Sequence, residues 1–137
     1  MLQPLAIVFY ERVMPGSQVV NRLQDLNYRV LAINNAALLA AITKRETPLL
    51  LLADLDARAD ICGAIQKIKA DPACAHLPVI AFAPDDKPEL LAAAEKAGAS
   101  FTIGESALAG HLPQLLDRAL QGVHLDSPPI ISVFGSS

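Results

Sequence analysis

The run at 49–53, LLLLA, is the feature that most limits what this chain can fold into, because it is apolar at every position. A strand with one face in water alternates apolar and polar residues, whereas a strand covered on both faces is apolar throughout. Strands of the second kind lie in the middle of parallel sheets. This run ends at Asp54, with Asp56 and Asp60 close behind. Carboxylates at the carboxyl edge of a parallel sheet are typical of the sites of α/β proteins.

Short apolar runs alternate with helical patterns along the rest of the chain. Five strands are expected, at 5–9, 28–33, 49–53, 79–83 and 100–103. Helices should follow them, with starts or caps expected at Pro15 or Ser17, Asn34 or Asn35, Asp60, Asp86 and Pro113. Gly98 is expected to end the fourth helix in a left-handed conformation. Five βα units in series predict the α/β class, with a five-stranded parallel sheet between two layers of helices.

The composition suits one domain without a membrane-spanning helix. The chain has 137 residues, 53% of them hydrophobic, which is enough for one domain with a substantial core. No apolar stretch approaches the roughly 18 residues of a spanning helix. The opening segment MLQPLAIVFYE has neither the basic start nor the cleavage site of a signal peptide. The net charge is −3 with scattered basic residues, so we expect a cytoplasmic protein that neither inserts into a membrane nor binds nucleic acid.

The cysteine and histidine residues give no metal-binding pattern. Cys62 and Cys74 fit a reducing compartment better than a disulfide framework. Cys74 and His76 are close in sequence, but no CxxC-type spacing accompanies them, and His111 and His124 add no ligand pattern. No metal site is predicted from these residues.

Residues 4–121 resemble the receiver domain of two-component response regulators in the order and length of their units. The segment PLLLLADL matches the family's apolar strand that ends in the phosphoacceptor aspartate, and the match carries this position over to Asp54. The segments HLPVIAFA and AAAEKAGAS match the family's fourth strand and fourth helix. The resemblance implies a receiver domain over residues 1–122 with the (βα)5, flavodoxin-like fold. Because function depends on the site and not on the scaffold, the site positions are compared one by one.

Four positions depart from the site that the resemblance implies. A receiver holds Mg²⁺ with two adjacent acids after the first strand, but these positions are Tyr10 and Glu11 here. The Ser or Thr after the fourth strand is Ala83, which cannot hydrogen-bond a phosphoryl oxygen, and the Lys after the fifth strand is Glu105. The aromatic switch position of the fifth strand is Thr102. With Asp54, the residues that outline a degenerate phosphoacceptor pocket are Tyr10, Glu11, Ala83 and Glu105.

The departures predict a pocket that has lost its reaction. Phosphoryl transfer depends on cations that neutralise the phosphoryl oxygens, and Glu105 replaces the attraction of a lysine by a repulsion. A unit-charge contact at about 4 Å near a protein surface is worth about 4 kcal/mol. Asp54 is then expected to be held by Lys87, Arg58 or water. Glu11, Asp54 and Glu105 could together bind Mg²⁺ or Ca²⁺, but we favour a hydrated acidic rim and expect no metal or other cofactor.

The segment 123–137 has no counterpart in a receiver. SPP at 127–129 is typical of a stiff linker, and IISVF at 130–134 predicts a further apolar strand. IISVFGSS resembles the first strand and loop of a MinD/ParA-type ATPase, just before its glycine-rich phosphate loop. A degenerate receiver joined to such an ATPase is similar to the TadZ/CpaE family of Flp (tight adherence) pilus assembly proteins. The alternative is a tail that is disordered or packs on the edge of the domain.

The resemblance implies a non-catalytic interaction and dimerisation module rather than an enzyme. In the TadZ/CpaE family it would help to place the pilus assembly and secretion machinery at a cell pole, beside an ATPase domain in cis. Receivers commonly dimerise through the fourth helix, fifth strand and fifth helix. The candidates on that face are Leu90, Leu91, Glu95, Phe101, Leu108 and Leu112. The alternatives are a response regulator that accepts phosphate on Asp54, and a receiver-like domain joined to another output.

Overall fold

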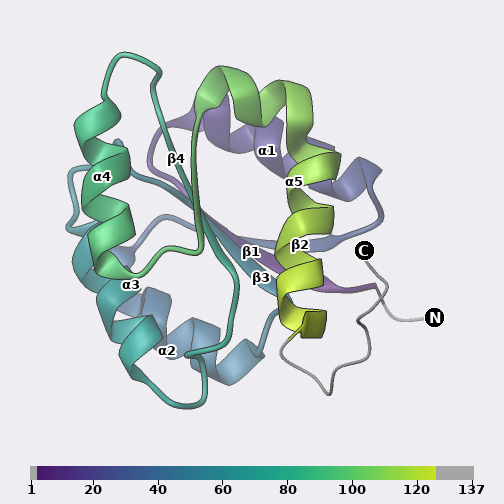
Figure 1. The fold of residues 1–137 in the computed structure, drawn as a ribbon, viewed down its shortest axis with the longest axis vertical. Coiled ribbons are helices and arrows are strands. Elements are labelled where there is room, and N and C mark those ends of the chain that lie inside the picture. Colours follow the sequence, from purple (N-terminus) through teal and green to yellow (C-terminus); the bar gives the residue numbers. More distant parts are fainter. Residues whose placement is uncertain (1–2, 126–137) are drawn as a thin grey trace.

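The apolar run becomes β3, Leu50–Asp54, in the middle of a five-stranded parallel sheet (Figure 1). The structure, a computed structural model, describes residues 3–125, with side chains as far as residue 120. The other strands are β1 (Leu5–Phe9), β2 (Arg29–Ile33), β4 (Val79–Ala83) and β5 (Phe101–Gly104). The helices are α1 (Val13–Asp25), α2 (Ala36–Glu46), α3 (Ile61–Ala70), α4 (Pro88–Ala97) and α5 (Glu105–Leu125). The order across the sheet is β2-β1-β3-β4-β5, and every neighbouring pair is parallel.

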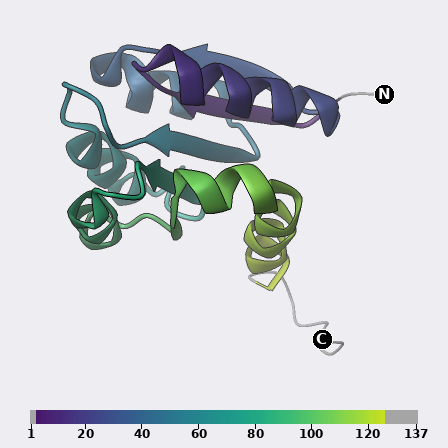
Figure 2. The same cartoon turned by 90° about the horizontal axis from the view of Figure 1, so that it is seen from above.

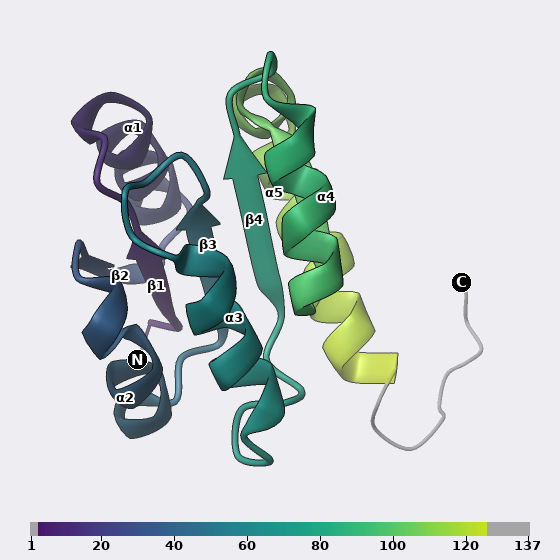
Figure 3. The ribbon, with the colours of Figure 1, turned by 90° about the vertical axis from the view of Figure 1, so that its left-hand side faces the viewer.

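Helices cover both faces of the sheet, as the continuous apolar strand predicts. α1 and α5 lie on one face, and α2, α3 and α4 lie on the other (Figures 2 and 3). Leu50 and Leu52 pack into the core under α1 and α5, whereas Leu51 and Ala53 pack into the core under the other three helices. All four side chains are fully buried. The α/β fold class expected from the sequence is therefore confirmed.

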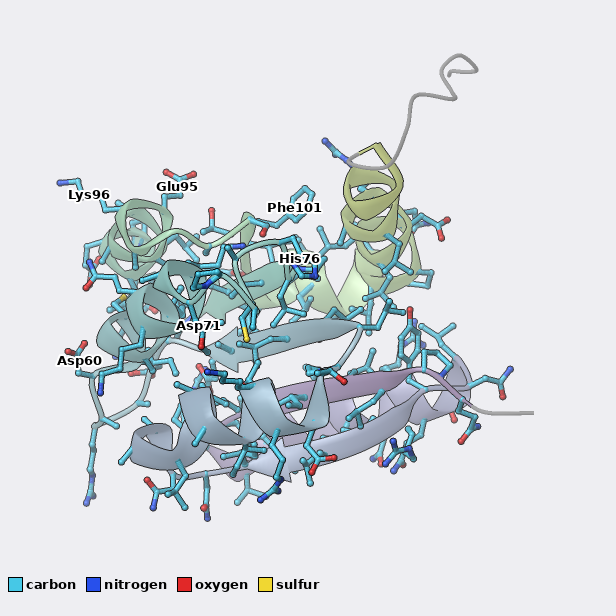
Figure 4. The ribbon with its side chains drawn as sticks, turned by 90° about the horizontal axis from the view of Figure 1, so that it is seen from below. Asp60, Asp71, His76, Glu95, Lys96 and Phe101 are labelled. Atoms are coloured by element: carbon cyan, nitrogen blue, oxygen red, sulfur yellow. The ribbon has the colours of Figure 1, made fainter. Side chains whose placement is uncertain are left out.

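Most element boundaries agree with the sequence patterns. Two predicted strands match β1 and β4, and the others shift by one residue, so that Asp54 is the last residue of β3. Asn35 Oδ1 accepts from Ala37 N at 2.9 Å, so Asn35 caps α2. Asp60, labelled in Figure 4, caps α3, because its Oδ1 accepts from Gly63 N at 3.0 Å. Gly98 ends α4 at φ 111°.

Three helix starts differ from the prediction, and the first two are those of α1 and α4. α1 begins at Val13, before Pro15 and Ser17. The residue that precedes α4 is Lys87, without a side-chain cap, so the prediction of Asp86 as its cap was wrong.

The last helix begins at Glu105, well before the predicted start near Pro113. The backbone leaves the helical conformation at His111, where φ is −130° and ψ is 22°. Pro113 follows this break and lies in the first turn of the second half, where its missing N–H removes no helical hydrogen bond. The sequence pattern that begins near Pro113 therefore predicted the second half of α5, but not the half that begins at Glu105. None of the helices within residues 3–125 is both long and apolar enough to cross a membrane.

The buried face of α2 contains a polar residue. Leu39 is buried, whereas its neighbour Leu38 is 51% exposed. Thr43 takes a core position instead, with a fully buried side chain. Among the residues that the structure describes, its hydroxyl is the one buried side-chain polar atom without a hydrogen-bond partner.

Replacement of that hydroxyl by a methyl group is expected to stabilise the domain. Thr43→Val keeps the shape of the side chain and removes a polar group that was desolvated without compensation, so the free energy of unfolding should rise by about 1 kcal/mol. Urea denaturation of the two proteins measures the change. A loss of stability would mean that the hydroxyl has a partner in solution.

Candidate functional site

Three charged side chains meet at the carboxyl edge of the sheet. Asp54 ends β3, Arg12 immediately precedes α1, and Glu105 begins α5. Arg12 Nε donates to Asp54 Oδ2 at 2.9 Å, and Arg12 Nη2 donates to Asp54 Oδ1 at 2.8 Å. The same Nη2 also donates to Glu105 Oε2. One guanidinium group therefore binds both oxygens of the aspartate and bridges it to the glutamate.

Asp56 and Lys87 extend this cluster on the side of β4. The Asp56 backbone N–H donates to Asp54 Oδ1 at 3.0 Å, and its carboxylate Oδ2 lies 3.7 Å from Arg12 Nη1. Lys87 Nζ lies 3.2 Å from Asp56 Oδ1. The three carboxylates and two cations form one connected network.

Burial and hydrogen bonding shift the pKa of Asp54 in opposite directions. The Asp54 side chain is fully buried, whereas that of Arg12 is 30% exposed. Desolvation raises the pKa of Asp54, and the hydrogen bonds from Arg12 and from the Asp56 N–H oppose this rise. The hydrogen bond to Asp54 raises the pKa of Arg12 above its ordinary value, so the guanidinium stays charged. A bidentate arginine is the geometry that best compensates a buried carboxylate.

The two residues at the acid-pair positions make contacts elsewhere. Glu11 accepts from the backbone N–H groups of Arg58 at 2.9 Å and Ala59 at 3.3 Å, and thereby holds the loop between β3 and α3. The ring of Tyr10 lies against Gly16 of α1, where an added Cβ would be 2.1 Å from ring carbons. Neither side chain is a partner of the Asp54 carboxylate.

The pocket position at the end of β4 carries no hydroxyl, and the neighbouring polar side chains pair with one another. Ala83 is fully buried at the end of β4. Asp85, in the following loop, accepts from the backbone N–H of Ser106 at 3.3 Å and from its hydroxyl. Thr102 Oγ1 donates to Glu95 Oε2 at 3.4 Å. These bonds connect the loop after β4 to the start of α5, and α4 to β5.

The sequence interpretation missed Arg12 as the partner of Asp54. The expected partners bind elsewhere: Lys87 pairs with Asp56, and Arg58 gives its backbone N–H to Glu11. The sequence nevertheless contained a signal for this ion pair. Arg12 follows the acid-pair positions directly after the first strand, and this places it at the same edge of the sheet as Asp54. Position 12 is not one of the positions that define a receiver site, so the resemblance assigns it no role.

The candidate metal cluster is not assembled. Glu11 faces two backbone N–H groups, and the Arg12 guanidinium lies between Asp54 and Glu105. No group of three His, Cys, Asp or Glu residues in the described part of the chain could hold a metal ion. Elsewhere in the fold, Cys74 is buried and His76 is exposed.

The predicted interface residues divide into two groups. Glu95 is exposed and points away from the sheet, and Phe101 is half-buried at its open edge (Figure 4). Leu90 and Leu91 are also half-buried. Leu108 and Leu112 are only 3% and 1% exposed, because the early start of α5 turns them onto the sheet. Within one copy these two side chains therefore belong to the core, and the dimer face expected from the resemblance stays a prediction.

Comparison with solved structures identifies the fold. The receiver domain of the sensor histidine kinase PA1611 from Pseudomonas aeruginosa, which has a magnesium ion coordinated in its active-site cleft, matches with a TM-score of 0.79 and 16% identity, over 88% of this chain and 99% of that one. The receiver domain of NtrX from Brucella abortus gives 0.73 and 23%, over 85% and 98%. The chemotaxis response regulator CheY4 of Vibrio cholerae gives 0.75 and 13%, over 86% and 99%.

No family model and no curated protein matches the sequence. The strand order, the helix layers and these structural matches nevertheless agree over most of the chain. This chain has the fold of the receiver domains of response regulators.

Proposed function

We propose that the domain is a receiver-like interaction module whose pocket is closed by its own arginine and is not controlled by phosphorylation. The observation that carries the proposal is the bidentate bond from Arg12 to both carboxylate oxygens of Asp54. A nucleophilic carboxylate needs a free oxygen and a cation that binds the incoming phosphoryl group. Here the cation, Arg12, instead binds the carboxylate of Asp54, which would have to act as the nucleophile.

The surroundings of the aspartate also oppose a phosphoryl group. A phosphoryl group on Asp54 would add negative charge beside Glu105 and Asp56, which already share the guanidinium of Arg12. Ala83 offers no hydroxyl to a phosphoryl oxygen. Attack by Asp54 would therefore require Arg12 to release at least one oxygen of this fully buried carboxylate, which is costly while the carboxylate is still charged.

The cellular role that we propose is the assembly and localisation of a Flp-type pilus. Its support is the resemblance of the sequence to the TadZ/CpaE family: a receiver with a degenerate pocket, followed by IISVFGSS, which lies outside the described residues. In this role the domain acts in the cytoplasm, at a cell pole, beside an ATPase domain in cis. It binds a second copy and components of the pilus machinery, and it catalyses no reaction.

Treatment with a small phosphodonor tests the proposal. The domain is incubated with acetyl phosphate and Mg²⁺ and analysed at once by intact-mass spectrometry, and separately titrated with beryllofluoride and Mg²⁺ under NMR observation. We expect no added phosphoryl group and no shift at the Asp56 amide, which reports on Asp54 through its hydrogen bond. An autophosphorylating receiver domain treated in parallel verifies the donor. Modification that disappears in Asp54→Asn would instead support a response regulator that accepts phosphate on Asp54.

A further inference from the structure

The last helix, α5, consists of two halves that run in different directions (Figure 1). The backbone leaves the helical conformation at His111, between residues 105–110 and the remainder of the helix. Pro113 follows the break, and it has no backbone N–H that could bond to the preceding turn. We call residues 105–110 the first half of α5 and residues 112–125 the second half. Because no continuous helix joins them, the two halves can differ in stability.

The two halves are held to the sheet in different ways. The buried apolar side chains of the second half are Leu112, Leu115, Leu116 and Ala119. The first half buries one side chain, that of Leu108, which is 3% exposed. A helix of about six residues is not stable by itself in water, so the first half depends on its tertiary contacts. Apolar burial therefore fixes the second half more firmly than the first.

Two polar contacts hold the start of the first half. Glu105 Oε2 accepts from Arg12 Nη2, which also donates to Asp54 Oδ1 at 2.8 Å. Asp85, in the loop after β4, accepts from the backbone N–H of Ser106 at 3.3 Å and from its hydroxyl. We call these contacts the two polar anchors. Both lie at the end of the first half that is farther from the helix break.

Solvent reaches the two polar anchors. The side chains of Arg12 and Glu105 are each 30% exposed, and Asp85 and Ser106 are exposed at the surface. Water competes with polar contacts at such positions, so each contributes little to stability. A segment that depends on such contacts opens at a lower free energy than the core of the fold. The first half should therefore open and close while the second half stays in place.

The first half also covers part of the apolar interior. It forms part of the wall of a cleft between α1 and α5, to which Glu105, Leu108 and Ala109 contribute. The volume of this cleft is about 330 Å³. Phe82 of β4 also lines the cleft, and its side chain is fully buried. Movement of the first half away from the sheet would enlarge the cleft and uncover Phe82.

We propose that the first half of α5 is a hinged segment that opens and closes over Phe82, with the break at His111 as the hinge. The two polar anchors hold the closed position. Arg12 binds Asp54 and Glu105 with the same nitrogen, so a change at the aspartate site also loosens the segment. The hinge thereby couples the carboxyl edge of the sheet to the apolar cleft. The inference goes beyond the proposed function and rests on it only for the position of Arg12.

Thiol labelling under native conditions tests the hinge. In a Cys62→Ser background, Leu108→Cys and Leu116→Cys place one thiol in each half, at positions that are 3% and 4% exposed. The rate of the background protein is subtracted, and urea denaturation of each variant corrects for global unfolding. We expect Leu108→Cys to react with Ellman's reagent at least about ten times faster than Leu116→Cys. Equal corrected rates would show that α5 opens as one unit and would overturn the proposal.

Removal of one polar anchor should speed the opening of the first half alone. Asp85→Ala removes the partner of Ser106, and we expect it to raise the labelling rate of Leu108→Cys about fivefold or more. The rate of Leu116→Cys should stay unchanged after the correction for global unfolding. Asp86→Ala is the matched control, because it removes the neighbouring exposed acid of the same loop. Equal effects of the two alanine variants would contradict the role of the anchor.

Amide hydrogen exchange gives a second measurement that needs no substitution in the core. The first four N–H groups of a helix have no partner within it, so the comparison uses the amides of 109–111 and of 116–120. We expect the amides of 109–111 to exchange at least about ten times faster, and faster still in Asp85→Ala. Equal protection of the two segments would contradict the hinge. Asp85→Ala leaves Arg12 and Asp54 unaltered, so the hinge and the closed pocket fail separately.

Discussion

Arg12→Met is expected to lower the free energy of unfolding by about 3 kcal/mol at neutral pH. The substitution keeps most of the aliphatic side chain and removes the guanidinium that binds both oxygens of Asp54. Loss of one partner from a buried ion pair leaves an uncompensated charge, which typically costs about 3–5 kcal/mol. The lower end applies because the Arg12 side chain is 30% exposed and water can partly replace it. Urea denaturation at several pH values measures the loss.

The stability that Arg12→Met loses should be larger at neutral pH than at low pH. Burial raises the pKa of Asp54, and removal of Arg12 takes away the strongest opposing hydrogen bond, so this pKa rises further in the variant. A carboxyl group whose folded pKa lies above its unfolded value, about 3.9, binds a proton more tightly in the folded state. Stability of the variant is therefore retained at low pH and lost as pH rises through the raised pKa. The deficit relative to the wild type should therefore shrink as the pH falls through this raised pKa.

Two further variants separate this ion pair from simple packing. Arg12→Lys keeps a charge but cannot form two parallel bonds, so we expect an intermediate loss. In an Asp54→Asn background the buried charge is absent, and Arg12→Met should then cost much less than in the wild type. A loss that is independent of pH and unchanged in this background would show that Arg12 stabilises the fold through its aliphatic part alone.

Gly16→Ala should destabilise the domain by about 1–3 kcal/mol. A Cβ at this position would lie 2.1 Å from two carbons of the Tyr10 ring, one of them the atom attached to the tyrosine Cβ. The ring cannot avoid the contact by a small rotation, so Tyr10 or α1 must move. Because Tyr10 and Arg12 belong to the same short loop, the displacement should also disturb the ion pair with Asp54. Urea denaturation measures the stability loss, and the amide shift of Asp56 reports on the site.

Gly110→Ala is the matched control. It is also a helical glycine, but nothing lies within 4 Å of an added Cβ, so the higher helix propensity of alanine should raise stability by about 0.5–1 kcal/mol. Tyr10→Ala should relieve most of the penalty of Gly16→Ala when the two are combined, because the clash is removed. A neutral Gly16→Ala variant would mean that the Tyr10 ring does not occupy this position in solution.

The fold could be predicted because each strand carries its own signal. The continuous apolar run of β3 requires burial on both faces, and the structure covers it with helices on both sides. Capping residues such as Asn35 and Asp60 are also local signals. The start of α5 was less visible, because the break at His111 separates two short helical patterns that no single periodicity describes.

The site was harder to predict because its chemistry depends on contacts between distant positions. Arg12 and Asp54 are 42 residues apart in sequence, and their bond depends on how α1 follows β1. The sequence identified the negative charges at the edge correctly but gave no direct indication of which cation would neutralise them. Glu105 appeared as an unfavourable replacement of a lysine, whereas in the structure it is a second partner of Arg12.

The most direct test of the closed pocket is the NMR signal of the Arg12 side chain. Its Nε–H donates to a fully buried carboxylate oxygen, so we expect a distinct Nε–H resonance with slowed exchange against water. The signal should persist when Mg²⁺ is added and should lose its protection in Asp54→Asn. A rapidly exchanging Nε–H in the wild type, or one that Mg²⁺ releases, would show that the arginine does not close the pocket.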